Sequence, residues 1–263
     1  MKKTYFAGLA VIVMCLCALF PLKVQAEEGY PVREKYSNVP FITTEEFFAE
    51  YDSIIIVDVR SKFEYDVIHV TKAPNIILSK KTFLEDLASV RAKDSTVKMA
   101  FYCNGHTCEK SYEAAQQAIE AGFKNVYTYD AGIFDWTNAH PELSTLMGQT
   151  PVDTEKLISK ENFNKRFMDY EEIKEKASDI NNVIIDIRDP FQREKIPNIP
   201  GLRNIPLDRM LILLQTGEFK SNHLYFIDAV GKQVNWLQYH LEANGYENYN
   251  FLKKGVLSTA DFK

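Results

Sequence analysis

Short, unbroken apolar runs alternate along this chain with stretches whose apolar residues recur at helical spacing. The runs are rich in isoleucine and valine, as at 54–57 and 183–185, and have no polar alternation. Such runs are typical of parallel strands buried on both faces. Helices are predicted over 45–51, 83–91, 110–121, 173–176 with its flanks, and 233–244. Strands that alternate with helices predict an α/β fold, with a central, mostly parallel sheet flanked by helices.

The same succession of patterns occurs twice. In each half a predicted helix start with hydroxyl and carboxylate residues (42–47 and 158–163) precedes a strand that ends in Asp-x-Arg (54–60 and 183–188). Three further pairs keep this order: 73–76 with 202–205, 100–103 with 225–228, and 122–127 with 245–250. This order predicts two similar domains, over residues 27–149 and 150–263, with the boundary near 148–151, where the composition becomes polar.

The first 26 residues have the pattern of a bacterial secretory signal peptide. A basic start, with Lys2 and Lys3, precedes an apolar run over 6–20 that is too short for a good membrane span. Val24-Gln25-Ala26 then offers a small-residue cleavage site. We therefore expect a periplasmic or secreted protein that is not stably inserted in the membrane after cleavage.

Removal of this segment changes the charge and the cysteine count. Three lysines and no acidic residue leave with it, so the formal net charge moves from −5 to −8. An acidic protein without a basic stripe is a poor candidate for binding nucleic acid or an anionic membrane. Of four cysteines only Cys103 and Cys108 remain, five residues apart, which indicates a chemical role and not a disulfide framework.

Cys103 stands where an apolar run over 97–102 meets a short polar loop and a predicted helix. Backbone N–H groups and the helix dipole favour an anion at such a position, whether a thiolate, a persulfide or a bound oxyanion. This geometry predicts that the pKa of Cys103 lies below the ordinary thiol value of about 8.5.

The first half resembles the rhodanese family, and the whole mature chain resembles a tandem rhodanese-type sulfurtransferase. The resemblance rests on the order and spacing of several weak motifs. They are Asp58-Val59-Arg60, Glu64-Tyr65, Ile68-His69-Val70, Ala73-Pro74-Asn75, Phe101-Tyr102-Cys103, Gly122-Phe123 with Asn125-Val126, and Ala131-Gly132 with Trp136. It implies two rhodanese-like domains, each with a parallel sheet flanked by helices.

What the resemblance implies is sulfur transfer through a persulfide on Cys103. The donor would be thiosulfate, a polysulfide or another persulfide, and the acceptor a thiophilic molecule or a partner protein. Loop amides would stabilise the terminal sulfur anion. No metal and no organic cofactor is required.

The loop after Cys103 supplies the candidate substrate-binding residues. These are Asn104, Gly105, His106, Thr107, Cys108 and Lys110. Ser111 lies eight residues after Cys103, so the loop is longer by about two than the usual family loop and could admit a larger substrate. Related cysteine phosphatases use an arginine to hold a tetrahedral oxyanion, and this loop offers His106 and Lys110 instead.

The roles of two of these loop residues are open, and two residues outside the loop have supporting roles. Cys108 could attack a persulfide on Cys103, form a reversible disulfide with it, or simply pack. His106 could orient substrate or tune the thiolate, or be a solvated loop residue. Asp58 and Arg60 are predicted to brace the loop from the neighbouring strand end.

The second half lacks the nucleophile. Asp228 stands where the repeat places a cysteine, in a loop of the usual family length over 228–233. A carboxylate cannot carry sulfane sulfur, so this half is predicted to be non-catalytic and to shape a cleft between domains. The leading prediction is an exported sulfurtransferase. The alternative is a thiol–disulfide or sulfur-carrier module that uses Cys103 and Cys108.

Overall fold

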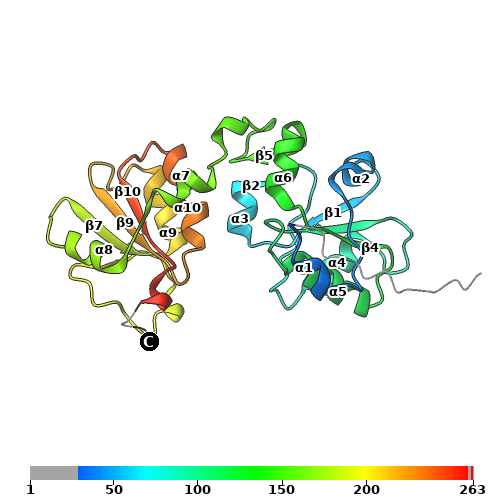
Figure 1. Ribbon diagram of the computed structural model, residues 1–263, viewed down its shortest axis with the longest axis horizontal. Helices are drawn as coiled ribbons and strands as arrows, with labels where there is room; N and C mark the ends of the chain where they lie inside the picture. Colours follow the sequence, from blue (N-terminus) through cyan, green and yellow to red (C-terminus); the bar gives the residue numbers. More distant parts are fainter. Residues whose placement is uncertain (1–28, 260–261, 263) are drawn as a thin grey trace, which may run out of the picture.

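The computed structural model describes residues 29–259 and residue 262, and Figure 1 shows that they form two α/β lobes side by side. The predicted signal peptide, 1–26, lies outside the described residues and remains a prediction. The strands of one parallel sheet lie between residues 55 and 129, and those of the other between 167 and 252. The domain boundaries proposed from the repeat remain a prediction as well.

Short helices and strands alternate throughout the first lobe. The elements are α1 (Val32–Lys35), α2 (Thr44–Ala49), β1 (Ile55–Asp58), α3 (Lys62–Val67), β2 (Ile68–Val70), α4 (Phe83–Val90), β3 (Met99–Tyr102), α5 (Lys110–Glu120), β4 (Val126–Tyr129), α6 (Gly132–Ala139), η1 (Pro141–Leu143) and β5 (Ser144–Leu146).

The second lobe alternates in the same way after a connecting 3-10 turn. Its elements are η2 (Thr154–Lys156), α7 (Lys160–Asn164), β6 (Phe167–Met168), α8 (Tyr170–Lys176), β7 (Asn182–Asp186), η3 (Pro190–Gln192), β8 (Arg203–Asn204), α9 (Leu207–Gln215), β9 (His223–Ile227), α10 (Gln233–Ala243), β10 (Tyr249–Leu252) and η4 (Val256–Ser258).

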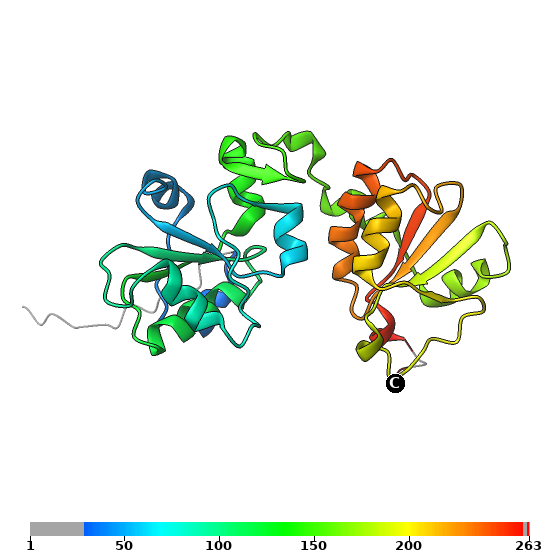
Figure 2. The same cartoon turned by 180° about the vertical axis from the view of Figure 1, so that it is seen from behind.

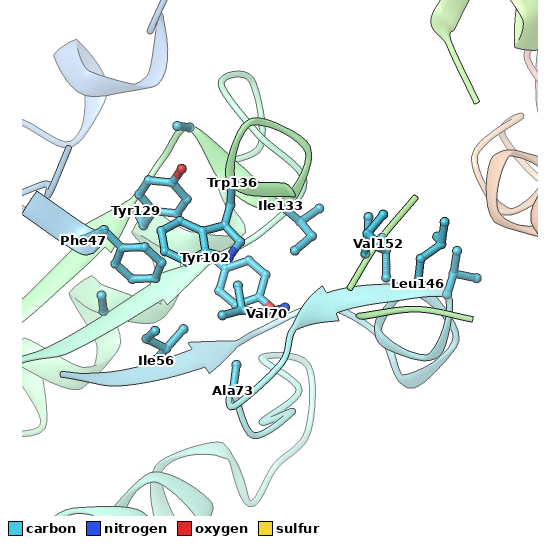
Figure 3. Packing of buried hydrophobic residues seen from close by; sticks show 14 of the residues in the cluster. Phe47, Ile56, Val70, Ala73, Tyr102, Tyr129, Ile133, Trp136, Leu146 and Val152 are labelled. Carbon is cyan, nitrogen blue, oxygen red and sulfur yellow. The ribbon is translucent and has the colours of Figure 1, made fainter. Parts of the chain in front are cut away.

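The first sheet is parallel, in the order β1-β3-β4, and helices cover both of its faces. Phe101 on β3 packs with residues of α4 and α5, whereas its neighbour Tyr102 packs with residues of α2 and α6 on the other face. Figure 3 shows the second of these cores, in which Phe47 lies against Tyr129 and Trp136. An antiparallel pair, β2 with β5, lies beside this sheet.

The second sheet is parallel in all its five strands, in the order β6-β10-β9-β7-β8. Successive residues of β7 again face opposite layers. Val183 and Ile185 pack with α9 and α10, while Ile184 packs with α8. The mixed α/β fold with parallel sheets and flanking helices is therefore confirmed.

The first sheet matches this strand order once its two edge bridges are included. Phe41 pairs with Thr128 beyond β4, and Asn75 pairs with Asp58 beyond β1. The five predicted helices are found within about two residues of their predicted ends, apart from the longer flank of α8. The helices α1, α3, α6 and α9 were not predicted from sequence.

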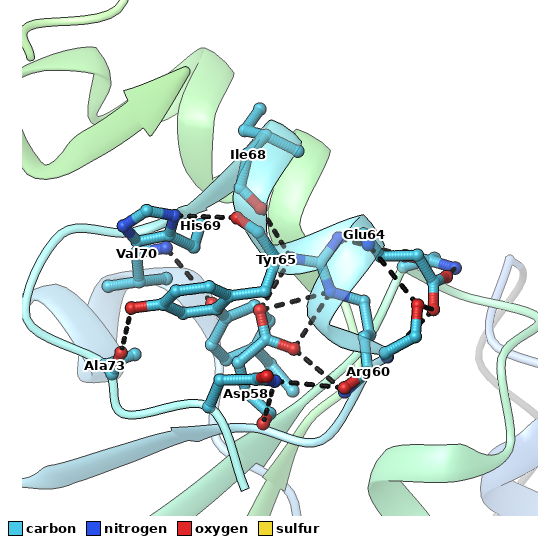
Figure 4. A network of polar contacts seen from close by, with 12 residues as sticks. Asp58, Arg60, Glu64, Tyr65, Ile68, His69, Val70 and Ala73 are labelled. Carbon is cyan, nitrogen blue, oxygen red and sulfur yellow. Dashed lines mark hydrogen bonds and ion pairs between the residues drawn. The ribbon is translucent and has the colours of Figure 1, made fainter. Parts of the chain in front are cut away.

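A buried ion pair closes the carboxyl end of β1 (Figure 4). Both side chains are fully buried, with Arg60 Nη2 2.6 Å from Asp58 Oδ2 and from the carbonyl oxygen of Ile68. Burial alone would lower the pKa of Arg60, but the charge and hydrogen bonds of Asp58 outweigh it and raise that pKa. Asn75 donates from Nδ2 to the carbonyl oxygens of Asp58 and Arg60, which fixes the turn after the strand.

The second lobe repeats this arrangement. Arg188 Nη2 lies 2.9 Å from Asp186 Oδ2, and both side chains are buried. Asn204 donates from Nδ2 to the carbonyl oxygens of Asp186 and Arg188, as Asn75 does in the first lobe. The two Asp-x-Arg motifs found in the sequence thus make the same local structure.

Helix α10 of the second lobe faces α3 of the first lobe (Figure 2) and also contacts α6. His240 stacks on Phe63 of α3, and Trp236 stacks on Phe134 of α6 with ring centroids 5.8 Å apart. The hydroxyl of Tyr239 accepts a hydrogen bond from the amide of Ile158 in the connecting segment. No helix among the described residues is long and apolar enough to cross a membrane.

We predict that Asp58→Asn lowers the free energy of unfolding by about 3–5 kcal/mol, because it leaves the charge of Arg60 buried without a counter-ion. Urea denaturation followed by circular dichroism would measure the loss. Asp66→Asn is the matched control, since Asp66 pairs with Lys62 at the surface, where such pairs contribute about 0–1 kcal/mol. Equal effects of the two substitutions would contradict a special role for the buried pair.

Candidate active site

Cys103 directly follows β3 and precedes the loop that leads into α5. The Cys103 side chain is only 1% exposed. Its thiol donates to the carbonyl oxygen of Cys108 at 3.3 Å and lies 3.6 Å from Ser111 Oγ at the start of α5. The strand end thus sets the sulfur beneath the loop and beside the helix N-terminus, as the sequence predicted.

The two cysteines of the loop share one site, and the predicted ionisation of Cys103 is wrong. Burial raises the pKa of the Cys103 thiol well above its ordinary value, and the neighbouring Cys108 raises it further. The neighbouring Cys103 side chain instead lowers the pKa of Cys108 to about 6, with help from the amides of Asn104 and Lys110 and from the Lys110 charge. The loop therefore favours ionisation of Cys108 over that of Cys103.

The buried ion pair reaches the loop through Asn104. Arg60 donates from Nη1 to Asn104 Oδ1 at 3.2 Å, and Asn104 Nδ2 donates to Glu64 Oε1 at 2.8 Å. Although burial of Glu64 opposes it, the hydrogen bond from Asn104 and the charge of Lys110 lower the pKa of Glu64. Both polar atoms of the Asn104 side chain therefore help to hold the loop.

His106 is held on three sides and is not the freely solvated loop residue of the alternative interpretation. Its Nε2 lies 2.8 Å from Asp135 Oδ2, and its Nδ1 lies 3.1 Å from the carbonyl oxygen of Gly29. The ring also stacks on Tyr30 with centroids 4.3 Å apart. Both ring nitrogens thus face acceptor oxygens.

A pocket of about 270 Å³ opens over the loop. It is lined by Asn104, Gly105, His106, Thr107, Cys108, Ala131 and Asp135. Two of the residues proposed from sequence lie elsewhere. Cys103 is buried and does not line the pocket, and Lys110 has its amine 3.6 Å from Glu64 Oε2. Among the described residues, no group of three or more His, Cys, Asp or Glu side chains is placed to hold a metal ion.

The loop is seated against α6 by a glycine contact. Gly132 has φ +77°, and a Cβ there would lie 2.4 Å from the backbone of Gly105. Only glycine fits this combination of backbone angle and close approach. The Ala131-Gly132 motif in the sequence is explained by this contact.

The corresponding loop of the second lobe is filled by its own carboxylate. Asp228 is 1% exposed and accepts hydrogen bonds from the backbone amides of Gly231, Gln233 and Val234 at the start of α10. Burial raises the pKa of Asp228 in spite of these amides. Where the first lobe directs its amides at sulfur, this lobe directs them at an oxygen anion of the chain itself.

The sequence interpretation missed three groups at this site. Asp135 and the N-terminal Gly29-Tyr30 segment hold His106, and Glu64 holds Asn104. Asp135 lies between two residues of the Ala131-Gly132 and Trp136 motif, which was a usable signal. Gly29 and Tyr30 carried no such signal, because only the folded chain brings them to residue 106.

The fold and this loop define a class of α/β protein with a thiol site between a parallel strand and a helix N-terminus. A family model for the rhodanese-like domain matches residues 44–139. The thiosulfate sulfurtransferase GlpE of Coxiella burnetii is 31% identical over 88 residues, which cover 34% of this chain and 76% of that protein. This chain belongs to the rhodanese-like family.

Other similar proteins share only part of their length with this chain. A tRNA uridine(34) hydroxylase of Hamiltonella defensa subsp. Acyrthosiphon pisum is 36% identical over 86 residues, which are 31% of this chain but only 23% of that protein. A crystal structure of a thiosulfate sulfurtransferase from Pseudomonas aeruginosa aligns at 21% identity and a TM-score of 0.36, over 83% of this chain and 42% of that one.

We predict that alkylation of the native protein shows a reactive thiol with a midpoint at about pH 6. Reactivity falls as the pH drops through this value, because the pKa of Cys108 is lowered and its thiolate is lost below it. Rates with iodoacetamide, with peptide mapping of the modified cysteine, would measure this. In Cys108→Ser the step near neutrality should vanish, since burial raises the pKa of the remaining thiol. A wild-type midpoint near the ordinary thiol value of about 8.5 would contradict the lowered pKa of Cys108.

Proposed function

We propose that this protein is an exported sulfurtransferase that carries sulfane sulfur as a persulfide on Cys103, within residues 27–149. The observation that carries the proposal is the placement of Cys103 between the end of β3 and the start of α5, where its thiol contacts the carbonyl oxygen of Cys108 and Ser111 Oγ. Membership of the rhodanese-like family and the similarity to a thiosulfate sulfurtransferase support a sulfurtransferase-type function. The donor is thiosulfate, a polysulfide or a persulfide, and the acceptor is a thiol or a partner protein. The protein acts in the periplasm or outside the cell.

The pair provides a nucleophile with its own base. The Cys108 thiolate takes the proton of Cys103 as the sulfur of Cys103 attacks the sulfane sulfur of the donor. The new bond joins Cys103 to that sulfur, and the old S–S bond breaks, with its electron pair leaving on the departing group. A proton returned from Cys108 neutralises a departing thiolate. Attack by an acceptor thiolate on the terminal sulfur then restores Cys103.

Dithiol redox chemistry is the second candidate function. It is favoured by the same observation, because the two thiols are free and interact within one loop. In this function Cys103 and Cys108 are oxidised together to a disulfide while a partner disulfide is reduced. Intact mass distinguishes the two, since a persulfide adds one sulfur atom and a disulfide removes two hydrogens.

The second half, residues 150–263, serves in this proposal as a non-catalytic rhodanese-like domain. It contains no cysteine, and Asp228 occupies its loop. Its α10 packs on α3 and α6 of the first lobe, and a cavity of about 520 Å³ lies between α6, α10 and the connecting segment. This half therefore supports the wall on which the first loop is seated.

We expect Cys103→Ser to abolish sulfur loading, because serine is close in size to cysteine and cannot hold sulfane sulfur. Cys108→Ser should still load in a single turnover, but more slowly and with its pH midpoint moved to higher pH, since Cys103 has lost its base. Loading is measured as the gain of one sulfur atom by intact mass after mixing with a polysulfide. Undiminished loading of the Cys103 variant would refute the assignment of the carrier.

Asp228→Asn should leave the rate of sulfur transfer within about twofold of wild type, because the carboxylate performs no chemical step. It should lower the free energy of unfolding by about 1–3 kcal/mol, since the asparagine N–H₂ turns a donor toward amides that need an acceptor. Steady-state transfer assays and urea denaturation would measure the two effects. A loss of activity at unchanged stability would instead give Asp228 a part in the reaction.

A further inference from the structure

We propose that the physiological donor is the persulfide of a thiol-bearing molecule, R–S–S⁻, and not thiosulfate. This inference rests on the proposed function and narrows its substrate. It follows from the charges and the hydrogen-bond donors that surround the cysteine loop.

Thiosulfate makes demands that a thiol persulfide does not. It carries two negative charges, and three of its atoms are sulfonate oxygens that require cations or several N–H donors. It leaves as sulfite, again a dianion. A thiol persulfide carries one charge, on the terminal sulfur that is itself transferred, and it leaves as a thiolate that a single proton neutralises.

The cations that contact the loop, within the part of the chain described, already face carboxylates. Arg60 is fully buried against Asp58, and Lys110 Nζ lies 3.6 Å from Glu64 Oε2. Lys35, which reaches Glu109 on the outer side of the loop, is paired with it. None of these three side chains lines the pocket.

The pocket itself holds an acid beside its one histidine. Asp135 lines the pocket and lies 2.8 Å from His106 Nε2, with its side chain 49% exposed. Within the described part of the chain, the pocket lining therefore offers no lysine or arginine to an incoming anion. The Asp135 carboxylate repels a dianion about twice as strongly as a monoanion, because Coulomb energy is proportional to charge.

The loop amides are already directed at the thiol sulfurs. Those of Asn104 and Lys110 point to Cys108, and that of Gly105 points to Cys103. They are therefore placed to stabilise negative charge on sulfur next to Cys103, where the terminal sulfur of a persulfide donor would arrive. Sulfonate oxygens arriving further out would meet Thr107, His106 and Asp135.

The proposed step balances without an added oxidant or reductant. The thiol of Cys103 and R–S–S⁻ give the Cys103 persulfide anion, Cys103–S–S⁻, and R–SH. One S–S bond breaks and one forms, and the electron pair of the broken bond leaves on the sulfur of the donor thiol. The proton taken up by Cys108 from Cys103 ends on that departing thiol.

The test compares two donors on the full chain, thiosulfate and the persulfide of 2-mercaptoethanol, whose only charge is on its terminal sulfur. The gain of one sulfur atom on Cys103 gives kcat/KM for each. We expect the persulfide to exceed thiosulfate by at least about tenfold, by the charge argument above. Thiosulfate loading as fast as the persulfide would overturn the donor inference alone. Loading by neither donor would overturn the proposed function and the inference with it.

Asp135→Asn separates the effect of the pocket from the intrinsic reactivity of the donors. Removing this charge should raise kcat/KM by about tenfold for the dianion and about threefold for the monoanion, with the change mainly in KM. Glu113→Gln is the matched control, because it removes the same charge from α5 outside the pocket lining and should change neither value. Equal changes for both donors in Asp135→Asn would overturn the inference.

Discussion

The buried pair of Asp58 and Arg60 is the interaction on which the site depends. A charge pair out of water is stable only when its remaining hydrogen-bonding groups are satisfied. Here those groups connect neighbouring segments. Arg60 donates hydrogen bonds to the carbonyl oxygen of Ile68 and to Asn104, and Asn104 donates one to Glu64. The pair therefore joins the end of β1, the β2 segment and the cysteine loop. Because the loop has little apolar surface of its own, its shape is determined by this network.

The same strand ends explain why one lobe offers a reactive sulfur and the other does not. In both, a parallel strand delivers a side chain to the N-terminus of a helix whose amides need an acceptor. In the second lobe Asp228 satisfies them with a carboxylate that is part of the chain, and nothing remains for a ligand. In the first lobe the corresponding position holds a thiol and no carboxylate, so an anion forms there only when a thiol ionises. Burial raises the pKa of Cys103, whereas the less buried Cys108 has a lowered pKa.

Periodicity and motif order were sufficient to predict the α/β class, five helices and the position of the cysteine between a strand and a helix. They did not predict α1, α3, α6 or α9, helices of four to nine residues that are too short to be stable alone and depend on tertiary packing. The pKa of Cys103 was predicted in the wrong direction because burial, which the sequence does not show, outweighs the loop amides. Gly29, Tyr30 and Asp135 are distant from His106 in sequence, so their contacts depend on the tertiary fold.

The pattern of pairing around the loop also limits the chemistry that the site can perform. A site that recognises a dianion usually leaves a cation free to meet it, and the unused charge costs stability until the ligand arrives. In the described residues around this loop each cation instead has an acidic partner, so the resting site is stable but offers little to a sulfonate. What it does offer is amide donors aimed at sulfur and a thiolate that can act as a base. Such a site favours a substrate whose negative charge lies on the transferred sulfur, because the amide donors that stabilise negative charge are directed at that position.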